Sequence, residues 1–569
     1  MGNVQPGIII EPSMRFYALL LLLCLPCAVA QQQEVTQTPV APPSTAQQDV
    51  TVEQYIRNGW APLTRSMTDC ATVHDPKLAG ASVVYLPHGY AIPSAVAALR
   101  TKCNVRVEHL PRAIAKEGDL MPSELKTPGL LYLPHRYVVP GGRFNEMYGW
   151  DSYFILLGLL SEGQESLARG MVENFFFEIE NYGAILNANR TYYLTRSQPP
   201  FLARMVDEVY RTMNRRDPDA AKTWLEKATP YLERDHALWM SDAHKAGDTG
   251  LARYFDLGTG PVPEMEDDST YYVDVIKWLL AHPEVKTNYL TQATDGQACA
   301  SGASAVCAHT EYQGWRLTPA FYRSDRAMRE SGFDVSFRFG PFSGSTENYA
   351  PVCLNALLYR YEIDVAGLYT KLGDDAKAKQ WTDAAEARKA AMNRYLWEAR
   401  TGTFADYDFV HHRRSTYLYA TAAYPLWAGL ATRAQAASTM RQLRTLTHDG
   451  GLAMSNTTSG MQWDAPFGWA PVNWIAVDGM SCYGYGTAVG RIAHGFMHSV
   501  RENYERDGTL REKYNVVDPQ KDVEVAAGYK SNVIGFGWTN AVYLKMNGLL
   551  FTGRSSDCAS TIPARSVPQ

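Results

Sequence analysis

The chain has 569 residues, of which 46% are hydrophobic and 20% charged, with Lys+Arg 54 against Asp+Glu 59 and a net charge of −5. This balance is typical of a large globular protein and excludes collagen-like, coiled-coil and wholly disordered chains. The slight negative charge argues against a dedicated nucleic-acid-binding protein, which would present a basic face.

The first fifty residues predict export. A basic residue, Arg15, precedes an apolar run at 16–30 that ends in an A-x-A pattern, as in a secretory signal peptide. The run is shorter than the about 20 residues that a membrane-spanning helix needs. We therefore expect a signal peptide at 1–30 (Met14 is an alternative start) and a disordered linker rich in Gln, Pro and Thr at 31–50. The mature protein is then secreted or periplasmic, without a membrane anchor.

Cysteine usage agrees with an oxidising compartment. Nine cysteines, less the two in the signal peptide, leave seven, so at least one has no partner within the chain. Cys70 can pair with Cys103, and Cys299 with Cys307, but the sequence leaves both pairings open.

Apolar residues recur at helical spacing over most of the remaining chain. The clearest case is a pair of apolar stripes at 354–368 and 378–396. Between them, Gly373 is a signal for the end of the first helix and Asp374 a signal for the N-cap of the second, so the segment is predicted to be an αα-hairpin. Strand patterns are sparse, and no fixed repeat or further low-complexity break appears. We expect one mainly α-helical domain at 51–552 and a flexible tail at 553–569. Similar helical patterns occur at 152–180, 202–213, 219–246, 415–446 and 486–506.

Segments rich in Gly, Pro and Trp separate the helices. One runs from Pro140 to Asp151, and a second from Gln462 to Pro471. Their Trp and Asp residues suit a sugar, whose ring has an apolar face and a hydroxyl rim. For any single residue an ordinary turn or a structural ion pair remains an alternative, but the recurrence of such segments favours a polyhydroxylated ligand.

Other chemistries lack their motifs. The sequence has no Walker loop, no nucleophile elbow of a serine hydrolase, and no His or Cys spacing typical of metal ligands. We therefore expect no cofactor and no metal.

The two Gly/Pro/Trp segments resemble the two signatures of the trehalase family of glycoside hydrolases, and shorter matches follow in family order at 331–334, 512–514 and 535–540. The resemblance covers about residues 51–550. It implies an all-α (α/α)6 barrel of helical hairpins with active-site loops at one end. It also implies an inverting hydrolase that cleaves α,α-trehalose to two glucose molecules with two carboxyl groups.

By motif position, Asp334 would be the general acid and Glu512 the general base. An inverting enzyme holds its two carboxyl groups about 6.5–9.5 Å apart to leave room for a water molecule. We expect burial or a nearby negative charge to raise the pKa of Asp334, whereas Glu512 must stay ionised. The structural alternatives are a helix cap for Asp334 and an exposed partner of Lys513 for Glu512. The substrate-binding candidates are Arg143, Phe144, Trp150, Asp151, Asn187, Arg196, Ser197, Gln198, Glu264, Gly332, Trp463 and Trp538.

Three positions depart from the family pattern. Val262 stands where the family usually has Arg, and Tyr529 and Val533 stand where it has Glu and Gln. We expect the loss of one sugar-binding arginine, and losses of this kind can change specificity while the catalytic pair is untouched. An inverting hydrolase of another α-linked disaccharide or glucoside, or a non-catalytic sugar-binding relative, therefore stays open. In each case we expect a monomer with a small sugar as its partner.

Overall fold

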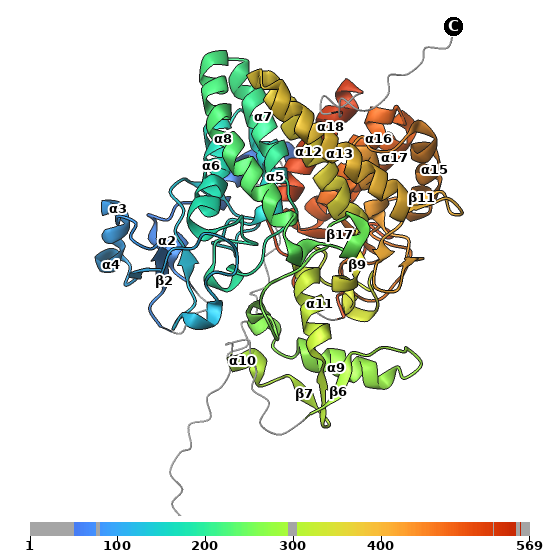
Figure 1. Ribbon diagram of the computed structural model, residues 1–569, viewed down its shortest axis with the longest axis horizontal. Helices are drawn as coiled ribbons and strands as arrows, with labels where there is room; N and C mark the ends of the chain where they lie inside the picture. The colour runs from blue at the N-terminus through green and yellow to red at the C-terminus, as the bar shows by residue number, and fades with distance from the viewer. Residues whose placement is uncertain (1–49, 76–79, 294–303, 527–528, 554–557, 559–569) are drawn as a thin grey trace, which may run out of the picture. The chain divides into compact units, whose positions relative to one another are not determined.

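Two layers of helices build the framework of the protein, which we describe from a computed structural model (Figure 1). The structure describes residues 50–75, 80–293, 304–526, 529–553 and 558. Apart from Val50, the predicted signal peptide and linker lie outside these residues, so the domain boundaries stay predictions.

The helices of the inner layer contact one another in chain order, and the last packs against the first to close a ring. They are α5 (Gly149–Ser161), α7 (Leu202–Asn214), α12 (Val352–Leu372), α14 (Tyr424–Trp427), α16 (Ala470–Tyr483) and α18 (Gly537–Thr552). An outer layer covers this ring: α1 (Val52–Leu63), α6 (Glu165–Tyr182), α8 (Pro218–Trp239), α13 (Asp375–Tyr395), α15 (Arg433–Leu443) and α17 (Gly486–Asp507). The described residues thus form an (α/α)6 barrel, and the predicted all-α fold is confirmed.

Burial explains the composition of the two layers. The inner helices α5, α16 and α18 are covered on nearly all sides and are apolar around most of their circumference. The outer helices α13 and α17 keep polar residues on the side facing solvent. The main hydrophobic core lies between and within these layers.

Local signals set the helix ends. The predicted hairpin is confirmed: α12 ends at Gly373, whose φ of +81° is left-handed, and the Asp374 side chain accepts a hydrogen bond from the Lys377 backbone N–H at 2.9 Å. Two longer predicted stretches are interrupted. The stretch at 152–180 breaks at Gly163 (φ +72°), and the one at 415–446 breaks at Gly429 (φ +75°), because these left-handed residues end a helix.

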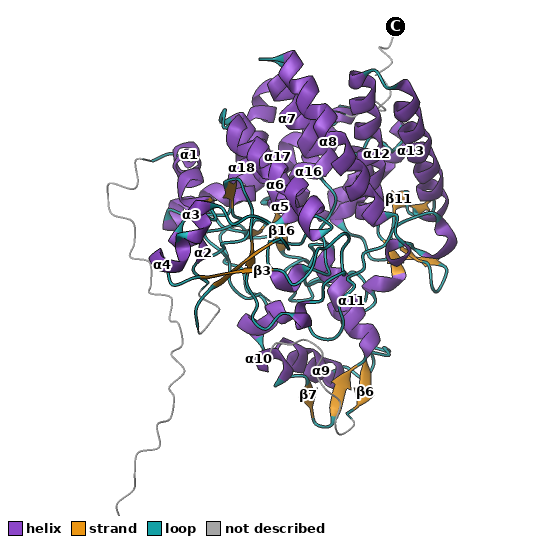
Figure 2. Ribbon diagram, turned by 60° about the vertical axis from the view of Figure 1, so that its left-hand side comes forward, coloured by secondary structure: helices purple, strands orange, loops and turns teal. Residues whose placement is uncertain are grey.

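Short helices and strands lie among the loops at one end of the long helices, as Figure 2 shows. The helices are α2 (Cys70–Val73), α3 (Ser94–Ala97), α4 (Leu99–Lys102), α9 (Tyr271–Ala281), α10 (Ser304–Cys307) and α11 (Pro319–Glu330). The strands are β1 (Thr64–Arg65), β2 (Val83–Leu86), β3 (Arg106–His109), β4 (Leu130–Leu131), β5 (Tyr137–Val138), β6 (Leu290–Gln292), β7 (Glu311–Tyr312), β8 (Trp315–Leu317), β9 (Tyr349–Ala350), β10 (Trp397–Glu398), β11 (Thr403–Phe404), β12 (Tyr407–Asp408), β13 (Arg413–Arg414), β14 (Thr447–His448), β15 (Gly451–Leu452), β16 (Phe467–Trp469) and β17 (Lys513–Asn515).

These strands make small separate sheets of two or three strands. In one sheet β2 pairs in parallel with β3 and β4, and in another β16 pairs antiparallel with β17. Across the described ranges, every helix is too short or too polar to span a bilayer.

Disulfide bonds join distant parts of the chain. The Cys70–Cys103 bond, which the sequence left open, is present, and Cys482–Cys558 is a second bond that the sequence analysis did not consider. Cys307 is disulfide-bonded, but its expected partner, Cys299, lies outside the described residues. Cys353 is free and buried, in keeping with the odd number of cysteines.

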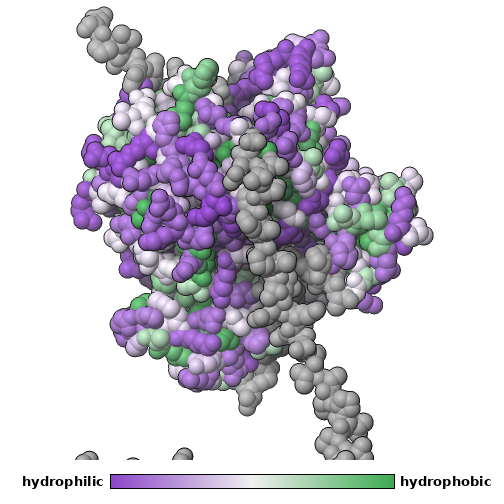
Figure 3. Space-filling view, turned by 180° about the vertical axis from the view of Figure 1, so that it is seen from behind, coloured by the Kyte–Doolittle hydropathy of each residue, from purple (hydrophilic) through white to green (hydrophobic). Residues whose placement is uncertain are grey.

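Hydrophilic residues predominate on the face seen in Figure 3, with apolar residues scattered between them. Among the described residues the large exposed hydrophobic side chains are Val410, Val517, Ile534 and Phe551. Apolar material is thus concentrated in the interior.

Candidate active site

A polar and aromatic pocket lies among the loops and helix ends, with about 850 Å³ of empty space when the adjoining open solvent is included. Both candidate carboxylates, Asp334 and Glu512, line it. So do all the substrate-binding candidates from the sequence except Ser197. The residues that sequence reasoning did not select are Pro140, Tyr148, Tyr192, Tyr193, Arg329, Gln462, Trp469, Tyr529 and Phe536.

The first signature enters the pocket through the start of α5. Trp150 and Asp151 lie in the first turn of this helix, and the Trp150 backbone N–H donates to Gln198 Oε1 at 2.9 Å. Gly332 approaches the Trp150 ring so closely that a Cβ atom would lie 2.9 Å from it. The glycine is therefore required both by this contact and by its φ of +75°.

The second signature supplies an aromatic wall. The rings of Trp463 and Trp469 stack with centroids 3.8 Å apart, and Trp150 lies 5.9 Å from Trp463 and 5.8 Å from Trp538. Because these rings pack on one another, they are held in fixed orientations at the pocket surface. An apolar wall of this kind suits the apolar face of a sugar ring.

The polar side of the pocket centres on Arg196. Its guanidinium is paired with Glu264 and lies 3.6 Å from Asp256. Three buried polar atoms here have no hydrogen-bond partner within the described protein: Arg196 Nε, Glu264 Oε2 and Gln462 Oε1. Buried polar atoms are normally satisfied, so these atoms are available to a polar ligand.

Asp334 follows α11 on the loop that begins at Ser331. Its side chain is 20% exposed, and Gln462 Nε2 donates to its backbone oxygen. Burial raises the pKa of Asp334 to about 7, while the positive charge of Arg329, 3.8 Å away, opposes the rise. Such a carboxyl group can hold a proton near neutral pH.

Glu512 is placed by strand pairing. β17 begins one residue later and pairs with β16, where Lys513 lies opposite Trp469. Lys513 is fully buried, and its ammonium donates to Glu512 Oε2 at 3.0 Å and to the Ser531 backbone oxygen at 2.9 Å. The charge of the Glu512 carboxylate is therefore balanced by a fixed cation.

A third carboxyl group shares the pocket. Burial, with the nearby charge of Glu512, raises the pKa of Asp151 well above its usual range. Asp151 can therefore donate a hydrogen bond as a neutral acid.

Of the three residues that depart from the family pattern, one lines the pocket and two do not. Val262 and Val533 are buried and do not line the pocket. Tyr529 lines it, and its hydroxyl accepts a hydrogen bond from Arg329 Nη1 at 3.1 Å. A guanidinium is thus present in the pocket wall although the position of the expected arginine carries Val262.

Ser197 does not line the pocket. Its hydroxyl donates to the Ile185 backbone oxygen at 2.6 Å, and its backbone N–H points to Glu330 Oε1 at 3.4 Å. The hydrogen bond from Ser197 to Ile185 therefore helps to hold the loop that carries Arg196 in place. Among the residues missed, Tyr148, Gln462, Trp469 and Phe536 lie within motifs that the sequence had marked, whereas Arg329 and Tyr192 had no such signal.

Comparisons with known proteins show the family of the chain. The sequence profile of the family described as trehalase matches residues 95–550. The chain is 34% identical over 504 residues to a protein named cytosolic neutral trehalase from Saccharomyces cerevisiae, covering 80% of this chain and 64% of the yeast protein. It is 36% identical over 462 residues to a periplasmic trehalase of Salmonella agona, covering 78% and 72%. The solved structure of neutral trehalase Nth1 from Saccharomyces cerevisiae superposes with a TM-score of 0.71 at 32% identity, covering 88% of this chain and 96% of that one.

Proposed function

Because this chain belongs to the trehalase family, we propose that it is a glycoside hydrolase that cleaves α,α-trehalose to two glucose molecules with inversion. The observation that carries the proposal is that Asp334 and Glu512 line the same pocket, where the surroundings of Asp334 favour its protonated form and those of Glu512 supply a cation for its carboxylate. One carboxyl group has a pKa raised to about 7, and the other is paired with a buried lysine. An acid and a base are what glycosidic hydrolysis by inversion requires.

In the proposed mechanism Asp334 gives its proton to the glycosidic oxygen while Glu512 takes a proton from the attacking water. The C–O bond to the leaving glucose breaks as the water oxygen bonds to the anomeric carbon on the opposite face. Arg196 Nε, Glu264 Oε2 and Gln462 Oε1 would then bind sugar hydroxyls, since the protein leaves them unpaired. The remaining pocket residues would orient the two rings.

We also propose that Arg329 and Tyr529 take over the sugar contacts that Val262 does not make. Both side chains line the pocket and are joined by a hydrogen bond. A guanidinium offers several donors in one plane, which suits a pair of hydroxyl groups. This substitution of one arginine by another from α11 keeps trehalose as the favoured substrate.

The test is hydrolysis of trehalose by the mature chain, followed by ¹H NMR of the anomers as they form. Inversion releases equal amounts of α- and β-glucose at the start, whereas retention releases α-glucose only. A panel containing maltose, kojibiose and nigerose would identify another preferred α-linked substrate. Absence of turnover on every sugar at any pH would contradict the proposal and favour a non-catalytic binding protein.

We further propose that the protein is exported and acts as a monomer. The signal-peptide pattern supports export, and so do the Cys70–Cys103 and Cys482–Cys558 bonds, because disulfides persist in oxidising compartments. N-terminal sequencing of the protein recovered from its native compartment tests cleavage after Ala30. Light scattering on the purified protein tests the monomer.

A further inference from the structure

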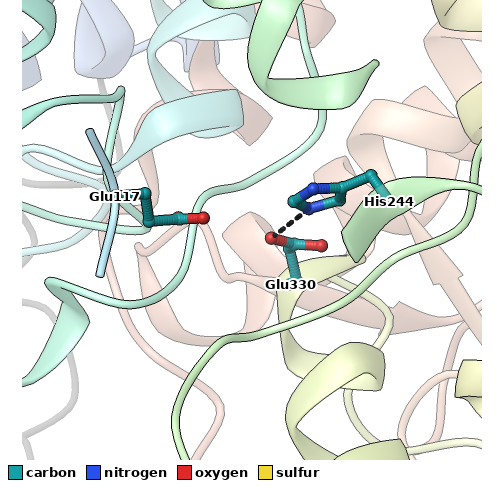
Figure 4. A group of neighbouring side chains, drawn as sticks. All are labelled: Glu117, His244 and Glu330. Atoms are coloured by element: carbon teal, nitrogen blue, oxygen red, sulfur yellow. Dashed lines mark hydrogen bonds and ion pairs between the residues drawn. The ribbon is translucent and has the colours of Figure 1, made fainter. Parts of the chain in front are cut away.

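Next to the pocket, but outside it, three side chains with metal-binding atoms converge from separate parts of the chain (Figure 4). Glu117 comes from the loop after β3, His244 from the 3₁₀ turn η4 (Asp242–His244), and Glu330 from the end of α11. One ligand atom from each lies within 4.8 Å of the others. Their exposed fractions are 4%, 0% and 0%, so the group is sealed from solvent.

Glu117 has no partner for its charge. Neither of its carboxylate oxygens has a hydrogen bond to the described protein, and Figure 4 shows the carboxyl group directed toward Glu330. Burial, with the nearby charge of Glu330, raises the pKa of Glu117 well above its usual range. A buried carboxyl group in this position must be neutralised by a proton or by a cation.

The neighbouring arginines are already committed elsewhere. Arg196, the cation that acts on Glu117, pairs with Glu264 and Asp256. Arg253, whose charge acts on Glu330, donates to the backbone oxygens of Ala243 and Glu347 at 3.0 Å each. Among the described residues, neither glutamate of the group forms an ion pair with an arginine or lysine, and the imidazole of His244 is the basic group that Glu330 contacts.

His244 and Glu330 are oriented as metal ligands are. His244 Nδ1 lies 3.1 Å from Ser241 Oγ, and in the tautomer in which Nδ1 donates to this hydroxyl the lone pair of Nε2 points toward Glu330 Oε1 at 3.3 Å. Glu330 Oε2 accepts from the Phe255 backbone N–H at 2.7 Å, while Oε1 lies on the side of His244 and has only the longer contact of 3.4 Å from the Ser197 backbone N–H. A hydrogen bond behind each ligand is typical of metal sites, because it sets the ring tautomer and the orientation.

We propose that Glu117, His244 and Glu330 bind one Zn²⁺ ion, with water as the fourth ligand. One imidazole and two carboxylates suit zinc, whereas calcium takes six or more oxygen ligands. Zinc–ligand bonds of about 2.0–2.2 Å require the three side chains to close by roughly an ångström from their present separation. The ion is structural: it joins the Glu117 loop and η4 to the last residue of α11, four residues before Asp334. This site is independent of which sugar the pocket takes.

The test begins with the mature protein purified without a metal-affinity column and stripped with a chelator. Elemental analysis after incubation with Zn²⁺ and dialysis should show one zinc per chain, with a higher Tm than the stripped protein. Co²⁺ in place of Zn²⁺ should give the visible absorption of a tetrahedral nitrogen–oxygen site.

Glu117→Gln is the decisive variant, because glutamine keeps the shape but does not supply the charge. It should lose most of the bound zinc and the Tm increase. The control is Glu178→Gln, another fully buried glutamate with an unpartnered oxygen but outside the group, which should keep both. Zinc retained by Glu117→Gln, or no zinc held by the wild type, would overturn the proposal and show that Glu117 is neutralised by a proton instead. If Glu117→Gln does not fold, the Co²⁺ spectrum of the wild type still decides.

Discussion

The guanidinium of Arg329 lies 3.8 Å from the carboxyl group of Asp334, measured from Nη1 to Oδ2. Two interactions fix the orientation of Arg329. It forms an ion pair with Asp325, with Nε 3.1 Å from Oδ2, and it donates a hydrogen bond to the Tyr529 hydroxyl. A positive charge therefore faces the proposed acid at a fixed distance. It limits the rise of the Asp334 pKa that burial causes.

This contact predicts the pH dependence of the Arg329→Gln variant. Asp334 must be protonated to act as the acid, so kcat/KM falls as the pH rises through its pKa of about 7. Removing the guanidinium raises that pKa and moves the alkaline limb of the pH–rate profile to higher pH. Tyr529→Phe keeps the guanidinium and should leave the limb nearly in place. A limb that is unmoved or moves to lower pH in Arg329→Gln would contradict the assignment.

The two carboxylates should be unequal in their effect on stability but alike in their effect on turnover. Asp334→Asn and Glu512→Gln should each lower kcat by about 10²–10⁴-fold, the usual contribution of a general acid or base. Steady-state kinetics on trehalose, with circular dichroism to verify folding, gives the measurement. A residual rate within a few-fold of wild type would remove that residue from the mechanism.

Asp334→Asn should also stabilise the protein above neutral pH. The folded-state pKa of Asp334 is raised, so the folded state holds its proton longer than the unfolded chain does, and stability falls as the pH rises from about 4 to about 7. Asparagine carries no such cost, so the variant should gain about 1–3 kcal/mol at pH 8. Urea unfolding at pH 5 and pH 8 checks this, since the gain should shrink at the lower pH.

Glu512→Gln should lose stability for the opposite reason. Lys513 is fully buried and would retain its charge without the carboxylate that balances it. We expect a loss of about 3 kcal/mol in urea unfolding, at the lower end of the usual cost of breaking a buried ion pair because Glu512 is partly exposed. The double variant Glu512→Gln/Lys513→Met should recover part of it; a further loss would indicate that the ammonium depends mainly on the Ser531 oxygen.

Gly332→Ala tests the contact with Trp150. The new methyl group would lie 2.9 Å from the indole ring at a residue whose φ is +75°, so both space and backbone oppose it. We expect a loss of about 1–2 kcal/mol in stability from the backbone alone, together with a raised KM as Trp150 shifts. Gly142→Ala is the matched control, because nothing lies within 4 Å of its Cβ position.

Removing the Cys70–Cys103 bond should cost stability without affecting the pocket. The bond closes a loop with a sequence separation of 33, for which chain entropy predicts about 3–4 kcal/mol. The double variant Cys70→Ser/Cys103→Ser should show this loss in urea unfolding and an unchanged KM, since neither residue lines the pocket. A changed KM would indicate that the N-terminal segment helps to position the pocket.

Sequence patterns predicted some helices far better than others. The α12–α13 hairpin and α17 were found because their stripes repeat at helical spacing and their ends carry glycine or aspartate. The inner helices α16 and α18 were not predicted as helices, since a helix buried on nearly every side has no polar face to reveal its period. Their starts were instead interpreted as loop motifs.

The sequence by itself determined the family, the two candidate carboxylates and most of the pocket, because these residues occur in contiguous motifs whose order along the chain is visible. Only the tertiary structure placed Arg329 in the pocket wall and brought the carboxyl group of Glu117 close to His244 and Glu330. Arg329 reaches the pocket from α11, and Glu117, His244 and Glu330 meet from segments more than 80 residues apart. Contacts of this kind follow from the closure of the helical ring, which brings distant loops together at one end, and no local spacing encodes them.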